Sequence, residues 1–156
     1  MVRIYWAESI MRNKSQHWMR VAREVATQGT CPRLHVGAVV VGRDGGIVST
    51  GYNGAPRAQP HCDDIGCLIE EKTGRCKRTV HAEANALLQA GKNAVGGTLY
   101  CTHQPCTECS NLILNSGIAR VYFEHPYTSQ EPSLMEAIVQ AYTTANVQLI
   151  QIAEMG

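Results

Sequence analysis

The sequence predicts an α/β fold of three layers, an α-β-α sandwich in which helices cover both faces of a five-stranded mixed sheet. Helix-type and strand-type patterns alternate along the second half of the chain, which is typical of right-handed crossovers between parallel strands. Two strand patterns in the first half are separated only by a short turn and indicate an antiparallel hairpin. With 156 residues, of which 44% are hydrophobic, the chain can bury one core, and we expect a single domain over residues 1–156.

The expected elements, in chain order, are a helix over 9–28, strands over 36–41 and 47–50, a helix over 80–90, a strand over 98–102, a helix over 106–115, a strand over 119–124, a helix over 133–145 and a strand over 147–152. Trp18, Val21 and Val25 recur at helical spacing in the first helix, and Gly29 follows the run. The hairpin strands are short apolar runs joined by a turn at residues 43–46.

Glycines and a cap mark the ends of the later helices. Gly91 follows the helix expected over 80–90, and Gly117 follows the helix expected over 106–115. Ser133 and Glu136 have the spacing of a capping box, which predicts that the last helix opens at Ser133. The three strands between and after these helices are therefore expected to be at least partly parallel.

Residues 51–78 separate the hairpin from the next helix and are rich in Gly, Pro, Asp, Cys and charged side chains. The composition predicts a long irregular segment, and segments of this length are usually functional or disordered. The cysteines of this segment and its His61 indicate that it is held in place.

A motif of three soft metal ligands and one carboxylate lies at the starts of two expected helices. His81-Ala82-Glu83 is followed by 21 residues and then by Pro105-Cys106-Thr107-Glu108-Cys109. Zinc is usually held by four groups, and a catalytic zinc keeps one position for water. One histidine and two cysteines supply three ligands, so this is the H-x-E…P-C-x-x-C pattern of zinc-dependent nucleobase deaminases.

The expected chemistry divides between the metal and Glu83. His81, Cys106 and Cys109 hold the zinc, which lowers the pKa of its water, and Glu83 moves protons during hydrolysis. A helix starting at Cys106 would favour its thiolate form. A purely structural zinc would instead need a fourth protein ligand, for which Cys101 and His103 lie nearby in sequence.

Charge and composition exclude other classes. The formal net charge is +1, so no strong overall field attracts a long polyanion, and we expect no nucleic-acid partner. No apolar run approaches the ~20 residues of a membrane span, and no secretion signal is visible at the start of the sequence. We therefore expect a cytoplasmic protein, in the host cytoplasm if it is phage-encoded. The seven cysteines are then expected to be reduced and partly metal-bound.

These motifs, together with Gly51-Tyr52-Asn53-Gly54 and the cysteine-rich segment, resemble the deoxycytidylate (dCMP) deaminases of the cytidine deaminase superfamily, in their bacterial and bacteriophage form. The resemblance extends from about Ser15 to Tyr127 and implies the cytidine deaminase-like fold. It also implies hydrolysis of dCMP to dUMP and ammonia, which supplies dUMP for thymidylate synthesis.

By resemblance, His81, Cys106 and Cys109 hold the catalytic zinc and Glu83 is the acid and base. The residues expected to contact the substrate are Asn53 at the sugar or phosphate end, the backbone of Ala82 at the pyrimidine edge, Tyr127 over the substrate, and Arg33 at the phosphate. Other roles stay open for three of them: a turn cap for Asn53, packing for Tyr127 and a solvated surface position for Arg33.

The resemblance further implies regulation and assembly. Several relatives are activated by dCTP and inhibited by dTTP, with Mg²⁺ on the triphosphate, and form hexamers. The segment expected to help build the effector site is Gly51, Tyr52, Asn53 and Gly54. A regulating nucleotide acts only by binding two states of the protein with different affinity.

A second, structural zinc is expected in the irregular segment, because a metal can order a loop with few apolar contacts. Some members of the resembled family carry such a zinc, with a cysteine at the place of Cys31. The preferred ligands are Cys31, His61, Cys67 and Cys76, with Cys62 as the substitute for His61. The alternative is a set of reduced, partly buried thiols.

Three other functions remain open from the sequence: a tRNA adenosine deaminase, a free cytidine deaminase, and a non-catalytic zinc- and nucleotide-binding accessory protein. The charge balance disfavours a large RNA substrate, and the Gly-Tyr-Asn-Gly motif with the long segment disfavours a free-nucleoside enzyme. The presence of Glu83 argues against a protein that has lost catalysis.

Overall fold

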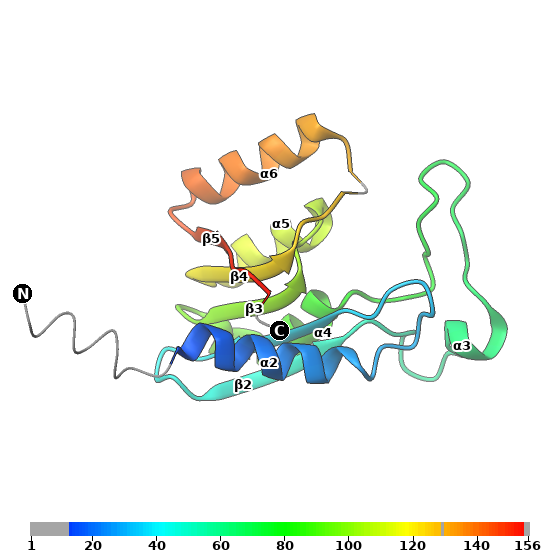
Figure 1. Ribbon diagram of the computed structural model, residues 1–156, viewed down its shortest axis with the longest axis horizontal. Helices are drawn as coiled ribbons and strands as arrows, with labels where there is room; N and C mark the ends of the chain where they lie inside the picture. The colour runs from blue at the N-terminus through cyan, green and yellow to red at the C-terminus, as the bar shows by residue number, and fades with distance from the viewer. Residues whose placement is uncertain (1–12, 129, 155–156) are drawn as a thin grey trace, which may run out of the picture.

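A five-stranded mixed sheet forms the centre of the molecule, in a computed structural model that describes residues 13–128 and 130–154. The strand order is β2-β1-β3-β4-β5; β1 pairs antiparallel with both β2 and β3, whereas β3, β4 and β5 are mutually parallel. The elements, most of which are labelled in Figure 1, are α2 (Lys14–Ala26), β1 (Gly37–Val41), β2 (Ile47–Tyr52), α3 (Cys62–Ile65), α4 (Ala82–Ala90), the short 3-10 helix η1 (Gly91–Ala94), β3 (Thr98–His103), α5 (Thr107–Ser116), β4 (Arg120–His125), α6 (Pro132–Thr144) and β5 (Gln148–Gln151).

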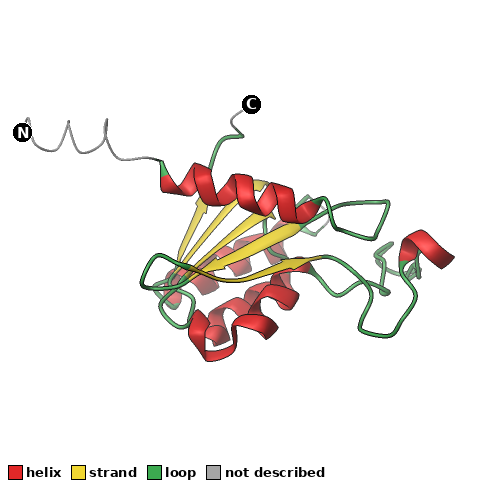
Figure 2. Cartoon of the chain, turned by 90° about the horizontal axis from the view of Figure 1, so that it is seen from below, coloured by secondary structure: helices red, strands yellow, loops and turns green. Residues whose placement is uncertain are grey.

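Helices cover the sheet on both faces, as expected. Among the helices that the structure describes, Figure 2 shows α2 on one face and the other long helices on the opposite face. The alternating residues of β1 divide between the two cores, since Val39 and Val41 pack with α2 whereas Ala38 and Val40 pack with α4, α5 and α6. Both faces of β1 are therefore buried, and the predicted three-layer sandwich is confirmed.

The predicted ends of the helices are less accurate than their positions. Helix α2 begins at Lys14, where the side chain of Asn13 accepts a hydrogen bond from the backbone N–H of Gln16. The part of the predicted helix before residue 13 lies outside the described residues. Helix α3 (Cys62–Ile65) was not predicted; it is a single turn, and Asp64 accepts a hydrogen bond from the backbone N–H of His61.

The predicted capping box of the last helix is wrong. Helix α6 begins at Pro132, with Glu131 as its N-cap, so Ser133 lies within the first turn. Proline is favoured at the first helical position because its fixed φ suits the helix and its missing N–H would have no partner there. The proline therefore sets this helix start, one residue earlier than the serine predicts.

Gly51 on β2 allows α4 to approach the sheet closely. A Cβ at this position would overlap the carbonyl oxygen of Ala82 and would lie 2.5 Å from the backbone nitrogen of Ala86. The side chain of Ser49, on the same strand, donates a hydrogen bond of 2.7 Å to the carbonyl of Ala86. Strand β2 and the first turn of α4 are thus in direct backbone contact.

We expect Gly51→Ala to lower the free energy of unfolding by about 1–3 kcal/mol, because the added methyl overfills a packed interface. Chemical denaturation measures this loss. Gly46→Ala is the matched control, since a Cβ there would lie 3.6 Å from its nearest neighbour, Asp44. Equal stability of the two variants would show that α4 can move away from β2 at little cost.

No described helix is long and apolar enough to cross a membrane.

Candidate metal centre and pocket

Two helix starts carry the predicted catalytic ligands. His81 is the N-cap of α4, and Cys106 is the N-cap of α5, so both residues have extended backbone just before a helix. Cys109 lies in the first turn of α5, and α4 packs against α5. The packing of these two helices brings ligands that are 25 and 28 residues apart in sequence to one place.

The ligand atoms of His81, Cys106 and Cys109 lie within 4.8 Å of one another. Nδ1 of His81 is 3.5 Å from Sγ of Cys106 and 3.3 Å from Sγ of Cys109. Hydrogen bonding to the Cys109 thiol lowers the pKa of Cys106, and His81 lowers it further. A readily ionised sulfur, a second sulfur and a histidine nitrogen together form a donor set that suits zinc.

Glu83 lies next to this group and is 3% exposed. Its Oε2 atom accepts a contact of 3.8 Å from Sγ of Cys109. Burial raises the pKa of Glu83, because the low-dielectric surroundings penalise its charged form. The carboxyl group is therefore protonated more readily than an exposed glutamate, and it lies where a general acid and base at this site would be needed.

The alternative fourth protein ligand is not supported. Within the part of the chain that the structure describes, the group of metal-type donors at this site contains only His81, Cys106 and Cys109. Cys101 is fully buried outside the group, and His103 Nδ1 is 3.0 Å from the hydroxyl of Thr102. Three protein ligands leave a coordination position for water or substrate, as in catalytic zinc sites.

A pocket of about 400 Å³ opens beside the metal ligands. It includes the four residues predicted to contact substrate, Arg33, Asn53, Ala82 and Tyr127, together with His81, Glu83 and Cys106. Sequence segments that are far apart thus meet at one cavity, of the size that small-molecule sites usually have.

Asn53 has backbone partners on both sides of its amide. Its Oδ1 accepts a hydrogen bond of 2.7 Å from the N–H of Val36, and its Nδ2 donates one of 2.7 Å to the carbonyl of Leu34. The side chain thus fixes the segment before β1, and its second amide hydrogen is left for a ligand. Asn53 thus has a structural role, although it joins two distant segments and does not cap a turn as the sequence alternative had it.

The Gly51–Gly54 segment, predicted to bind an effector, borders the start of α4. Gly54 and Val80 exchange backbone hydrogen bonds of 3.2 and 2.7 Å, which fix the chain just before His81. The side chain of Tyr52 is exposed, whereas Gly51 is buried against α4. The segment therefore contacts the catalytic helix directly.

Sequence reasoning missed several pocket residues, among them Arg75, Thr79, His103 and Gln104. Gln104 Oε1 accepts a hydrogen bond of 3.2 Å from the backbone N–H of Tyr127, which holds that residue at the pocket. Their sequence signal is weak, except that Gln104 directly precedes the Pro-Cys pair. Arg75 lies near the end of the irregular segment and Thr79 directly after it, where no periodicity in the sequence indicates which side chains point into the pocket.

Arg75 is the one charged residue in that set. Burial lowers the pKa of its guanidinium, but the charges of Tyr127, Glu108 and Cys106 outweigh burial and raise it above the usual value. Nη1 of Arg75 lies 3.3 Å from Oε1 of Glu108 in an ion pair. The side chain of Arg75 is 19% exposed and that of Glu108 is 63% exposed, so the pair joins the pocket wall to the surface of α5.

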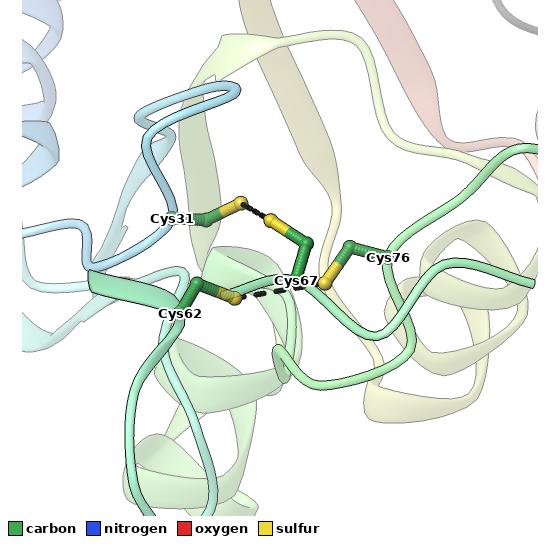
Figure 3. A group of neighbouring side chains, drawn as sticks. All are labelled: Cys31, Cys62, Cys67 and Cys76. Carbon is green, nitrogen blue, oxygen red and sulfur yellow. Dashed lines mark hydrogen bonds between the residues drawn. The ribbon is translucent and has the colours of Figure 1, made fainter. Parts of the chain in front are cut away.

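Three cysteines of the irregular segment and Cys31, from the loop between α2 and β1, form a second cluster (Figure 3). The sulfurs of Cys31, Cys62, Cys67 and Cys76 lie within 4.8 Å of one another, with separations of 3.6 Å for Cys31 to Cys67 and for Cys62 to Cys76. Burial opposes ionisation of Cys76, but the backbone N–H groups of Arg78 and Leu68 and the neighbouring thiols lower its pKa to about 7. Four convergent sulfurs, one of them readily ionised, fit a structural zinc.

The predicted preference for His61 over Cys62 in this cluster is corrected. Nδ1 of His61 lies 2.9 Å from the hydroxyl of Thr30 and accepts a hydrogen bond of 3.3 Å from the N–H of Ala55. Cys62 is buried, and its sulfur lies with the other three. The side chain of His61 therefore supports the chain around the cluster, and its neighbour supplies the fourth sulfur.

The family model described as "Cytidine and deoxycytidylate deaminase zinc-binding region" matches residues 12–125. The chain belongs to this family. The matched range contains both cysteine groups, Glu83 and most of the pocket, and ends at the last residue of β4.

Two curated relatives show how far the similarity to individual deaminase-family proteins extends. "ComE operon protein 2" of Bacillus subtilis is 40% identical over 144 residues, which cover 90% of this chain and 73% of that protein. The "Deoxycytidylate deaminase" of Mycobacterium phage D29 is 40% identical over 119 residues, covering 69% of this chain and 91% of the phage protein.

A solved structure of the family has the same fold. The dCMP deaminase of the cyanophage S-TIM5, crystallised with dCMP and dUMP, superposes with a TM-score of 0.73 at 28% identity. The match covers 91% of this chain and 99% of the cyanophage chain. The architecture predicted from the sequence is therefore that of the cytidine deaminase-type dCMP deaminases.

Proposed function

We propose that this deaminase-family protein hydrolyses dCMP to dUMP and ammonia and so supplies dUMP for thymidylate synthesis. The observation that carries the proposal is the convergence of His81, Cys106 and Cys109 beside the buried carboxyl of Glu83, at the wall of one pocket. The named activity of the phage D29 relative and the dCMP and dUMP in the cyanophage crystal support this choice of substrate.

His81, Cys106 and Cys109 would hold the catalytic zinc, and zinc in such a site makes hydroxide available near neutral pH. Glu83 accepts the proton of the attacking water and delivers it to the ring nitrogen next to the carbon under attack. The same carboxyl then helps to protonate the departing amine, so that one water is consumed and one ammonia released.

The pocket residues orient the substrate for this step. The backbone of Ala82 meets the pyrimidine edge, and Tyr127 lies over the substrate. Arg33 and the remaining amide hydrogen of Asn53 face the sugar and phosphate. Orientation of this kind lowers the barrier because the reacting atoms are held in place before the reaction.

Regulation belongs to the same proposal. dCTP with Mg²⁺ activates, dTTP inhibits, and the Gly51–Gly54 segment forms part of the effector site in a hexameric assembly. The exposed side chain of Tyr52 and the hydrogen bonds between Gly54 and Val80 support a path from this segment to His81. We place the protein in the cytoplasm, where its nucleotides are found.

An ultraviolet assay of dCMP, cytidine, deoxycytidine and dCTP tests the proposed substrate. We expect dCMP to give the highest kcat/KM, because the pocket combines a deaminase centre with the cations Arg33 and Arg75. Protein stripped with a chelator should be inactive, and zinc should restore it. Preference for an unphosphorylated nucleoside, or no turnover of any of the four compounds, would contradict the proposal.

A further inference from the structure

The pocket has two permanent positive charges in its lining, Arg33 and Arg75. A nucleoside monophosphate brings about two negative charges at neutral pH. The carboxyl of Glu83 and the thiol of Cys106 lie in the same lining and carry no positive charge that could attract an anion. These two guanidinium groups are therefore the permanent cations in the lining that can attract a phosphate.

The surroundings of the two arginines differ. Arg33 is exposed, and its Nη1 donates a hydrogen bond of 3.0 Å to the carbonyl of Gly74. The side chain of Arg75 is 19% exposed. Because solvent screens exposed charges more strongly than buried ones, Arg75 is the stronger centre for a bound anion.

Arg75 is also held in place by the chain around it. Its carbonyl accepts a hydrogen bond of 2.9 Å from the N–H of Glu70, and Lys77 donates one of 2.7 Å to Leu68 across the same narrow loop. The next residue, Cys76, is part of the four-sulfur cluster drawn in Figure 3. The backbone that presents this guanidinium is therefore fixed before substrate arrives.

The partner of Arg75 leaves room for a ligand. Both contacts with Glu108 come from Nη1, at 3.3 and 3.5 Å, which are long distances for an ion pair. Glu108 is largely exposed, so water can solvate it if the guanidinium turns toward the pocket. A guanidinium has five N–H donors, so it can contact a phosphate oxygen while it keeps part of its bonding to Glu108.

We propose that Arg75 is a specificity-determining residue that binds the phosphate of the substrate and so separates dCMP from deoxycytidine. The inference rests on the proposed function. It assigns to the loop around Cys76 a direct part in substrate choice, because Cys76 of the four-cysteine cluster and the phosphate-binding Arg75 are adjacent residues.

The test compares kcat/KM for dCMP and deoxycytidine in the wild type, Arg75→Gln and Arg75→Lys. We expect Arg75→Gln to lower kcat/KM for dCMP about 10- to 100-fold, mainly through KM, and to leave deoxycytidine unchanged. Arg75→Lys should recover part of the loss, since it restores the charge without the planar fork. Lys92→Gln removes an exposed positive charge outside the pocket and should leave both substrates unchanged.

The outcomes separate phosphate binding from a role at the zinc. An equal loss for both substrates, or a fall in zinc content, would mean that Arg75 acts through its neighbour, the zinc ligand Cys106, and would overturn the inference. An unchanged ratio of the two kcat/KM values would overturn it as well.

Equilibrium dialysis with dUMP and deoxyuridine provides a readout that does not depend on turnover. We expect Arg75→Gln to weaken binding of dUMP and not of deoxyuridine, and inorganic phosphate to compete with dUMP in the wild type. A wild type that binds dUMP in this way but does not deaminate dCMP would refute the proposed function and leave the role of Arg75 intact. Equal binding of dUMP by the variant and the wild type would refute the role of Arg75.

Discussion

Replacing Glu83 with glutamine should lower kcat for dCMP about 10²- to 10⁴-fold, the range that a positioned general acid and base contributes. Glutamine has nearly the same shape but can neither accept the proton of the attacking water nor deliver it to the ring. Because Glu83 is 3% exposed and lies beside Cys109, no bulk water is in place to take over the transfer. Steady-state assays of the zinc-loaded variant measure the loss.

Two measurements make this result specific to proton transfer. The zinc content of Glu83→Gln should equal that of the wild type, because Glu83 is outside the group of three metal-type donors. Glu136→Gln makes the same chemical change at an exposed position of α6 and should keep full activity. Full turnover by Glu83→Gln would remove the carboxyl from the mechanism.

The convergence of His81, Cys106 and Cys109 was predictable because these residues lie at defined places in regular elements. His81 and Cys106 precede helices, and Glu83 and Cys109 lie within the first turns that follow. Helix geometry fixes the direction of each side chain once the start of the helix is known. A sequence motif at a helix start therefore predicts where its side chains lie relative to one another.

The ligands of the second cluster were only partly predictable, for a physical reason. His61 and Cys62 are adjacent residues in a segment without periodicity, so nothing in the sequence shows which of them faces Cys31. In the structure Thr30 and Ala55 both contact Nδ1 of His61, and the sulfur of Cys62 lies with the other three cysteines. Arg75 was missed for the same reason, since its direction depends on the loop that the cluster holds.

Replacing Cys62 of the four-cysteine cluster with serine should remove one zinc ion per chain. We propose that its four sulfurs hold a structural zinc, which would give two zinc ions per chain with the catalytic one. A serine hydroxyl is a poor ligand for zinc in place of a thiolate, so the variant should bind about one. Mass spectrometry under native conditions, or elemental analysis, counts the metal.

Matched variants distinguish this cluster from a set of ordinary thiols. Cys101→Ala removes a cysteine outside both groups, and His61→Ala removes the imidazole that lies beside the cluster without joining it. Both variants should keep two zinc ions, whereas Cys62→Ser should also unfold at a lower temperature, because metal binding contributes directly to the stability of the segment. One zinc per chain in the wild type would dismiss the second site, and one zinc in His61→Ala would return the imidazole to the ligand set. The same variant connects the cluster to substrate binding. Cys62→Ser should also raise KM for dCMP, because the loop that holds the backbone of Arg75 in place would lose its zinc.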